Sequence, residues 1–123
     1  MGLAVSLVHK LSRKHEDDLH DLLGGHQSKS SGNQWADQGD GRRGRYQNRF
    51  GWCWDAKCAL PQTKSISVTR DMADKITHQA HGDRPLLPLR FYADERGGVA
   101  HDLVVMRLDD LVELLEAAEG NLS

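Results

Sequence analysis

Three residues in the middle of the chain have the chemistry of a hydrolytic metal site. Asp55 and Lys57 lie in the aromatic segment FGWCWDAKCAL (residues 50–60), and Asp40 lies upstream at hairpin distance. Hydrolysis of a phosphodiester needs an activated water and a stabilised leaving oxygen, and Mg²⁺ can supply both. Mg²⁺ prefers carboxylates and waters as ligands, and a nearby lysine can hold the water or neutralise developing charge. The spacing therefore predicts Asp40 and Asp55 as metal ligands and Lys57 as the assisting cation.

The Asp-Ala-Lys triplet alone is a weak signal, because such triplets occur by chance and also form surface ion pairs. Its context favours the hydrolytic interpretation. Aromatic residues precede it on a predicted strand, and Gly39-Asp40 lies at a suitable distance upstream. On a preceding predicted helix, Glu16 shares one face with Leu19 and Leu23, at i, i+3 and i+7. An acidic residue in line with core-facing leucines is unusual.

The elements that would position these residues follow from periodicity and capping signals. A helix is predicted from Ser12, a possible N-cap, to Gly24-Gly25. A second helix is predicted from Thr69, also a possible N-cap, to Gly82. In the strand at residues 50–60, alternation should place one set of side chains on one face (Trp52, Trp54 and Ala56) and a second set on the other (Cys53, Asp55 and Lys57).

The remaining elements complete a mixed α/β pattern. Asp110 and Glu113 form a capping box for a last helix, LVELLEAAE. Further strands are predicted within residues 33–41 and at residues 64–68, 85–93 and 99–108. The order α, β, β, β, α, β, β, α predicts an α/β fold with a mixed β-sheet flanked by helices.

Length and charge limit the organisation of the chain. Its 123 residues suit a single domain spanning residues 1–123, and the polar stretch 25–49 is predicted to be largely loop. The 16 basic and 18 acidic residues give a net charge of −2, which excludes a broadly basic nucleic-acid binder. Any contact with DNA phosphates must come from a local patch, and the alternative for such a patch is a solvated loop. The candidates are Arg42, Arg43, Arg45 and Arg49.

Taken together, these motifs resemble the PD-(D/E)XK nuclease superfamily, and most closely its archaeal-type Holliday junction resolvases and their phage relatives. The resemblance extends from about Glu16 to Phe91. It rests on Glu16, Ser30-Ser31-Gly32-Asn33, Gly39-Asp40, Asp55-Ala56-Lys57, the segment Ser65-Ile66-Ser67-Val68, and a helix leading into PLLPLRF.

The resemblance implies a restriction-endonuclease-like fold and a Mg²⁺-dependent endodeoxyribonuclease in which Mn²⁺ substitutes. Asp40 and Asp55 would ligate the metal, and Glu16 would complete the acidic site. Lys57 would assist the attacking water. Ser31 corresponds to a loop serine that lies close to the active site in those resolvases.

Some features depart from the family pattern. The middle acid is Asp55 rather than the commoner glutamate, which shortens its reach but keeps the ligand type. Gly39, rather than proline, precedes Asp40, as is usual in the resolvase branch. The arginine-rich segment 41–49 is longer than a tight hairpin needs. Whether Gln79 or His20 also joins the site stays open.

The substrate implied by the resemblance is branched DNA, in particular a four-way junction. A junction has near twofold symmetry and needs paired cuts, so a homodimer would match it. The nearer alternative is a nuclease of the same fold that cuts duplex or single-stranded DNA. A non-catalytic DNA-binding or interaction module is the other, although the intact Asp40, Asp55 and Lys57 argue against it.

Cysteine use and hydropathy predict a cytoplasmic protein, consistent with a phage-encoded enzyme in a bacterial host. Cys53 and Cys58 would point to opposite faces of one strand, so two free thiols are expected. No segment approaches the roughly 20 apolar residues of a membrane span. The short apolar run at residues 3–8 lacks the basic flank of a signal peptide.

Overall fold

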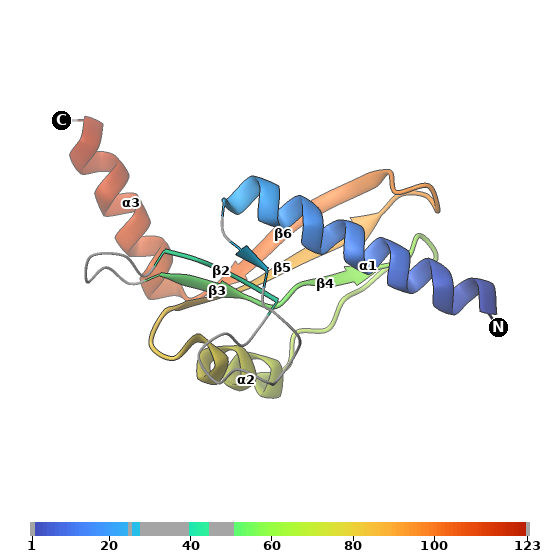
Figure 1. Ribbon diagram of the computed structural model, residues 1–123. Helices are drawn as coiled ribbons and strands as arrows, with labels where there is room; N and C mark the ends of the chain where they lie inside the picture. Colours follow the sequence, from blue (N-terminus) through green and yellow to red (C-terminus); the bar gives the residue numbers. More distant parts are fainter. Residues whose placement is uncertain (1, 25, 28–39, 45–50, 123) are drawn as a thin grey trace.

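The computed structural model describes residues 2–24, 26–27, 40–44 and 51–122. Within these ranges the chain forms a mixed β-sheet with three helices (Figure 1). The elements in chain order are α1 (Gly2–Leu23), β1 (His26–Gln27), β2 (Gly41–Arg43), β3 (Trp52–Trp54), β4 (Lys57–Ala59), α2 (Arg70–Ala80), β5 (Arg84–Tyr92), β6 (Val99–Met106) and α3 (Leu108–Leu122).

The sheet is built around β5, which has neighbours on both edges. β6 pairs antiparallel with one edge, and β3 and β4 pair parallel with the other. β3 and β4 follow one line with a common register, because Trp54 lies opposite Leu86 and Lys57 opposite Leu89. β2 pairs antiparallel with β3, and β1 with β2. This mixed α/β architecture is consistent with the predicted restriction-endonuclease-like fold.

The two faces of the sheet are covered by different helices, α1 on one side and α2 on the other (Figure 1). On the α2 face, Cys53 packs with Ile76 and Leu87. On the α1 face, Trp54 packs with Leu19 and Leu86, and Trp52 and Ala56 lie against the same cluster. The predicted alternation along residues 50–60 is confirmed for these residues. The prediction of free thiols is also confirmed for Cys53 and Cys58.

Local signals explain α2 better than α1. The hydroxyl of Thr69 accepts a hydrogen bond from the Met72 amide at 3.2 Å, as an N-cap should. The prediction that α1 starts at Ser12 is wrong, because the helix begins at Gly2. The side chains of Leu11 and His15, which belong to α1, are buried. The helix therefore begins upstream of the predicted cap and packs against the sheet from Leu11 onward.

Three other boundaries differ from prediction. Residues 64–68 form no strand, and only Ile66 among them packs onto the α2-side cluster. The last helix begins at Leu108, and Asp110 and Glu113, which were predicted to cap it, lie within it and pair with Arg84. The predicted loop at residues 25–49 contains β1 and β2 where it is described. The strand expected within residues 33–41 falls mostly outside the described residues.

Candidate active site

A pocket of about 240 Å³ opens between α1 and the strands, where β2 begins and the β3–β4 line is interrupted. Four of the residues that the sequence singles out for chemistry meet there, although they come from three different parts of the chain. The lining residues are Ser12, His15, Glu16, Asp40, Asp55, Ala56, Lys57 and Cys58.

Backbone hydrogen bonds fix the two aspartates on neighbouring strand ends. The Asp40 amide donates to the Trp54 carbonyl at 2.8 Å, and the Asp55 amide donates to the Leu86 carbonyl at 3.1 Å. The Ala56 amide donates to Oδ2 of Asp40 at 2.6 Å. Both main chain and side chain therefore hold the Asp40 carboxylate beside the interruption at Asp55 and Ala56.

Gly41, immediately after Asp40, allows the two strands to approach this closely. It lies opposite Trp54 in the register of β2 and β3. A Cβ atom at Gly41 would lie 2.3 Å from the Trp54 ring, which is far inside van der Waals contact. The indole, 1% exposed, thus fills the space that a side chain would need. In the pair Asp40-Gly41, the aspartate supplies a carboxylate to the pocket and the glycine leaves room for the Trp54 ring.

The electrostatics of the pocket are dominated by the close carboxylates. Burial, and next the neighbouring Asp55 carboxylate, raise the pKa of Asp40 from 3.8 to about 8. Glu16 acts in the same direction, and the hydrogen bond from the Ala56 amide opposes it. Asp40 therefore holds a proton at neutral pH unless another positive charge replaces it.

Lys57 lies over the same site. Its Nζ is 3.5 Å from Oδ2 of Asp55, and the two side chains are 38% and 17% exposed, respectively. The prediction that Lys57 shares a face with Asp55 is confirmed. The ammonium remains partly open to solvent and can also reach a group that enters the pocket.

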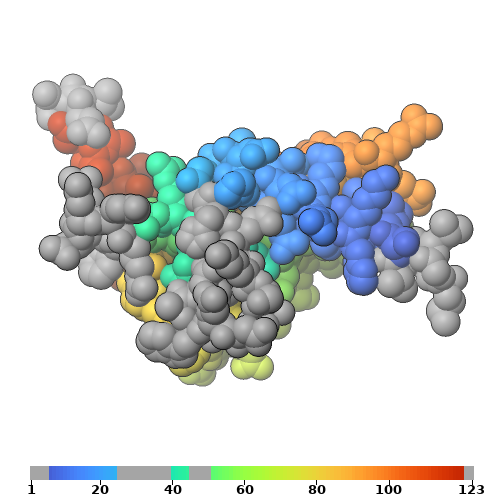
Figure 2. Space-filling view, in the orientation of Figure 1, coloured from blue at the N-terminus to red at the C-terminus, as the bar shows by residue number. Residues whose placement is uncertain are grey.

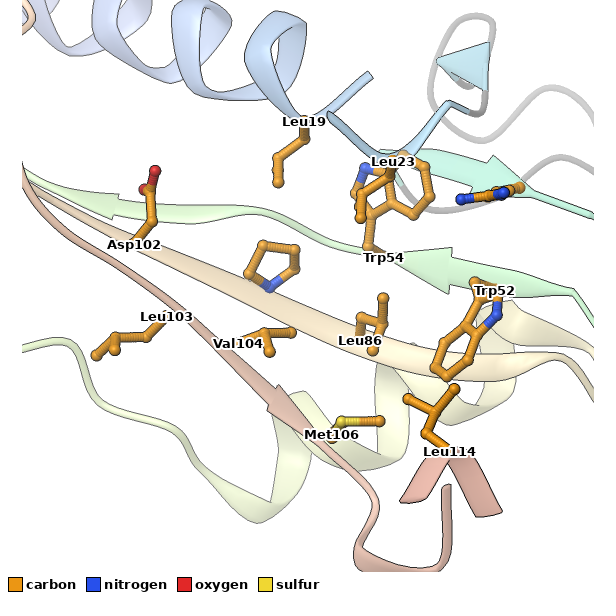
Figure 3. A pocket seen from close by; sticks show the side chains of 12 residues that line it. Leu19, Leu23, Trp52, Trp54, Leu86, Asp102, Leu103, Val104, Met106 and Leu114 are labelled. Carbon is orange, nitrogen blue, oxygen red and sulfur yellow. The ribbon is translucent and has the colours of Figure 1, made fainter. Parts of the chain in front are cut away.

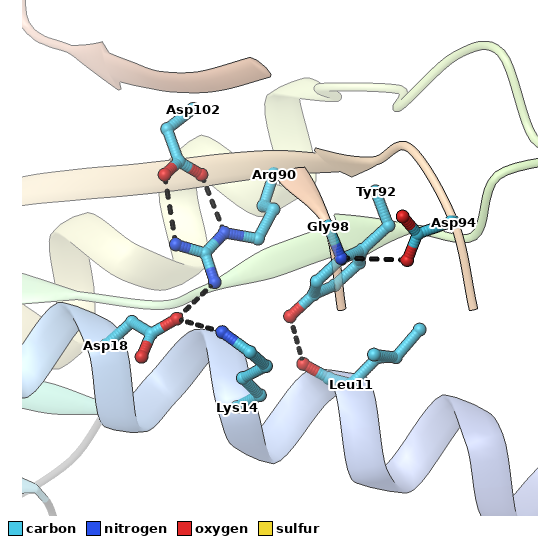
Figure 4. Close-up of polar contacts among 8 residues, drawn as sticks. All are labelled: Leu11, Lys14, Asp18, Arg90, Tyr92, Asp94, Gly98 and Asp102. Atoms are coloured by element: carbon cyan, nitrogen blue, oxygen red, sulfur yellow. Dashed lines mark hydrogen bonds and ion pairs between the residues drawn. The ribbon is translucent and has the colours of Figure 1, made fainter. Parts of the chain in front are cut away.

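An ion-pair network positions α1, and with it Glu16, against the sheet (Figure 4). Arg90, buried on β5, contacts Asp102 through two hydrogen bonds at 2.7 and 2.9 Å, and Asp18 at 2.6 Å. Tyr92 on the same strand donates to the Leu11 carbonyl at 2.6 Å. The bond with Arg90 holds the pKa of Asp102 below its usual range. These contacts tie α1 to β5 and β6 on the side of the helix away from the pocket.

His15 lines the pocket but was missed by the sequence analysis. Its ring is 2% exposed, and Nε2 lies 3.4 Å from the Pro88 carbonyl. Burial lowers the pKa of His15, so the ring is neutral at neutral pH. With Nε2 donating, Nδ1 is an acceptor with no partner among the described residues. The spacing Leu11, His15, Leu19 at intervals of four could have indicated its inward position.

The arginine cluster separates into different environments. Arg42 is buried, and its guanidinium bonds to the Asp83 carboxylate at 2.8 Å and to the carbonyls of Gln79 and Ala80. The expectation that Arg42 contacts DNA phosphates is therefore corrected: this side chain ties β2 to the end of α2. Arg43 is exposed. The predictions for Arg45, Arg49 and Ser31 lie outside the described residues.

The two residues left open by the sequence do not line this pocket. Gln79 lies at the end of α2, where its carbonyl binds Arg42. His20 is half-buried on α1, and its Nδ1 has no partner in the part of the chain that the structure describes. Neither residue contributes to the lining where Asp40 and Asp55 meet.

The donor set can be tested for its fit to a metal. Within residues 2–24, 26–27, 40–44 and 51–122, no three His, Cys, Asp or Glu side chains are grouped as a ready cage. Mg²⁺ does not need one, because it keeps several waters and uses one or two carboxylates. Asp40 and Asp55 form such a pair, and burial together with the Asp55 carboxylate raises the pKa of Asp40, so a cation bound between them would be favoured. The residues present fit a hard divalent cation.

Comparisons of the chain with protein-family models, curated proteins and solved structures return no match. The argument for function therefore rests on the geometry of the pocket and the fold that builds it. In the described part of the chain, no helix has the length and apolar character needed to span a membrane.

Proposed function

We propose that this protein is a Mg²⁺-dependent DNA endonuclease that hydrolyses phosphodiester bonds, with four-way junctions as its preferred substrate. One observation supports the proposal above all. Asp40 and Asp55 converge on one pocket with Lys57 and Glu16, at a point where strand pairing is interrupted. An ordinary surface ion pair would not bring a second buried carboxylate against Asp55.

The pocket residues divide the chemistry among them. Asp40 and Asp55 would hold the metal through carboxylate oxygens, with Glu16 completing the acidic side. When bound, Mg²⁺ would activate a water and stabilise the leaving oxygen, and Mn²⁺ would substitute. Lys57 would orient the attacking water or neutralise charge that develops on the phosphate. Its Nζ lies 3.5 Å from Asp55, within reach of a phosphate placed there.

The phosphate backbone would approach along the open side of this pocket. Arg13, exposed on α1, lies three residues before Glu16 and so borders the same face of the helix. With Arg42 assigned to the fold, Lys57 lines the pocket and Arg13 is an exposed cation on the neighbouring face of α1. Arg45 and Arg49 remain predicted phosphate contacts.

Junction resolution also predicts a homodimer. A four-way junction offers two equivalent strands across a twofold axis, so two active sites at a fixed separation would produce paired nicks. Linear duplex of the same sequence should be cut much more slowly.

A cleavage assay tests this proposal directly. A four-way junction, a linear duplex and a single strand would be compared in Mg²⁺, with EDTA as a control. Asp55→Asn should abolish cleavage and spare DNA binding, because it removes a ligand charge with little change in bulk. Asp74→Asn is the matched control, since Asp74 forms only an exposed pair with Arg70 on α2.

The outcomes separate the alternatives. Cleavage at an undiminished rate in EDTA, or by Asp55→Asn, contradicts the metal-dependent mechanism. Equal cleavage rates on junction and duplex would support a nuclease without a preference for junctions. Binding without cleavage of any DNA would favour the non-catalytic module.

A further inference from the structure

Exposed apolar side chains are concentrated on β6 and α3. Twelve large hydrophobic residues are exposed among the described residues, and most of them belong to β6 and α3. β6 is an edge strand, paired only with β5 in the described sheet. On the side of the sheet that α1 covers, this surface consists of Val104, Leu108, Leu111, Val112, Leu114 and Leu115. Leu103 and Val105 pair with Leu89 and Leu87 and so point to the α2 side.

α3 lacks the packing that normally stabilises a helix of its length. It projects from the body of the molecule (Figure 2), and every residue from Leu111 to Gly120 is exposed. Its contacts with its own chain are concentrated near its start, where Asp110 and Glu113 pair with Arg84. A helix of about 15 residues is marginal in water unless its apolar face is covered. The seam formed by Leu108, Leu111 and Leu115, at 3–4 residue spacing, has no such cover.

A complementary groove lies on the same side of the sheet as α1 (Figure 3). It has a volume of about 490 Å³ and is predominantly apolar. Arg43 lies at its margin and is exposed. Its lining comes from α1 (Leu19 and Leu23), β3 (Trp52 and Trp54), β5 (Leu86 and Pro88), β6 (Asp102, Leu103, Val104 and Met106) and Leu114 of α3, with Asp102 held by Arg90.

We propose that this surface is the interface with a second copy of the chain, in which the apolar seam of α3 from each copy lies in the groove of the other. The seam and the groove occur on one molecule, so a single twofold arrangement covers both at once. A different partner would have to cover the seam and the groove separately.

Charge favours a second copy over nucleic acid. α3 has five acidic and no basic residues, which leaves 18 − 5 = 13 acidic against 16 basic residues elsewhere. DNA phosphates would be repelled by this helix, whereas the rest of a second copy attracts it. Glu116 and Glu119, beside the seam, suit the exposed Arg43 at the groove of the other copy.

The area is also sufficient. These six residues expose about 520 Å² in total, if a fully exposed Val or Leu presents about 170 Å², and a specific interface buries about 600–1,000 Å² per partner. The groove walls add to this area. The surface is therefore large enough for a stable dimer at micromolar concentration.

Sedimentation velocity of the full chain, without DNA and in EDTA, tests the proposal. The wild-type protein should be dimeric at about 10 μM, and Leu111→Gln with Leu115→Gln should raise the dimer Kd about a hundredfold or more. The matched control is Val8→Gln with Leu22→Gln, because Val8 and Leu22 are exposed apolar residues on α1 at 39% and 71%. This control should associate as the wild type does.

A second pair of variants probes the groove without altering α3. Val104→Glu, in β6, should also weaken the dimer, whereas Val68→Glu, at a comparably exposed site outside the surface, should not. A wild-type monomer, a dimer that survives both interface variants, or equal weakening by the controls would overturn the proposal. These measurements do not depend on cleavage. If a monomeric variant still cut duplex DNA, the proposed chemistry would be supported independently of the dimer.

Discussion

Replacing Asp40 by asparagine should stabilise the metal-free protein, and the gain should depend on pH. In the wild type, burial and the Asp55 carboxylate raise the pKa of Asp40 to about 8. In the unfolded chain the Asp40 carboxyl ionises near its ordinary pKa of 3.8. The free energy of unfolding therefore falls as the pH rises from about 4 to about 8. Asparagine cannot ionise, and its side-chain oxygen can still accept the hydrogen bond from the Ala56 amide. The free energy of unfolding of Asp40→Asn should therefore not show this fall with pH.

The magnitude follows from the size of the pKa change. At about 1.4 kcal/mol per pH unit, ionising Asp40 in the fold costs at most about 6 kcal/mol above pH 8. Water entry and movement of Asp55 would relieve part of this cost. We expect Asp40→Asn to raise the free energy of unfolding by about 3 kcal/mol at pH 9 and by less than about 1 kcal/mol at pH 5.

Urea unfolding in EDTA at pH 5, 7 and 9 measures this difference. Asp74→Asn serves as the control, because its exposed carboxylate should give no pH-dependent gain. Adding Mg²⁺ at pH 7 should stabilise the wild type and not Asp40→Asn. If Asp40→Asn is no more stable than the wild type at pH 9, or if the difference does not change between pH 5 and 9, the carboxylate repulsion inferred here is wrong.

Three further substitutions separate catalysis from folding. Lys57→Ala should slow single-turnover cleavage about a hundredfold with little change in DNA affinity; an equal loss of affinity would assign Lys57 to binding. Arg42→Gln should lower the free energy of unfolding by about 3 kcal/mol, because it removes the buried ion pair with Asp83. The salt dependence of DNA binding by this variant should be unchanged, and a reduced slope would return Arg42 to the phosphate contacts. Gly41→Ala should lower the free energy of unfolding by about 2 kcal/mol through the clash with Trp54, and urea denaturation that shows no loss would contradict the close approach.

The sequence predicted the fold best where short-range signals and packing agree. Thr69 caps α2 as expected, and alternation along residues 50–60 correctly separates Trp54 from Cys53. Alternation also placed Lys57 beside Asp55, because the two residues keep the same face on either side of the strand interruption.

Long-range contacts account for what the sequence did not predict. Arg42 looks like one of four similar arginines in a polar stretch, and only the fold brings Asp83 against it. Ser12 has the chemistry of an N-cap, yet it lies inside α1, next to the buried Leu11. The inward position of His15 depends on the same packing. Local propensity could not decide among these outcomes, since the deciding contacts join residues far apart in the chain.

The hydrogen bond from the Ala56 amide to Asp40 has a consequence for how this protein could diverge. The amide donates to Oδ2 of Asp40, the residue before β2, so a side-chain oxygen serves as its acceptor. Loss of the acidic function need not entail loss of this acceptor. If the proposed cleavage is lost in a lineage, drift should remove Lys57 early and change Asp40 to asparagine rather than to an apolar residue. An inactive descendant would then be recognisable by what persists at position 40.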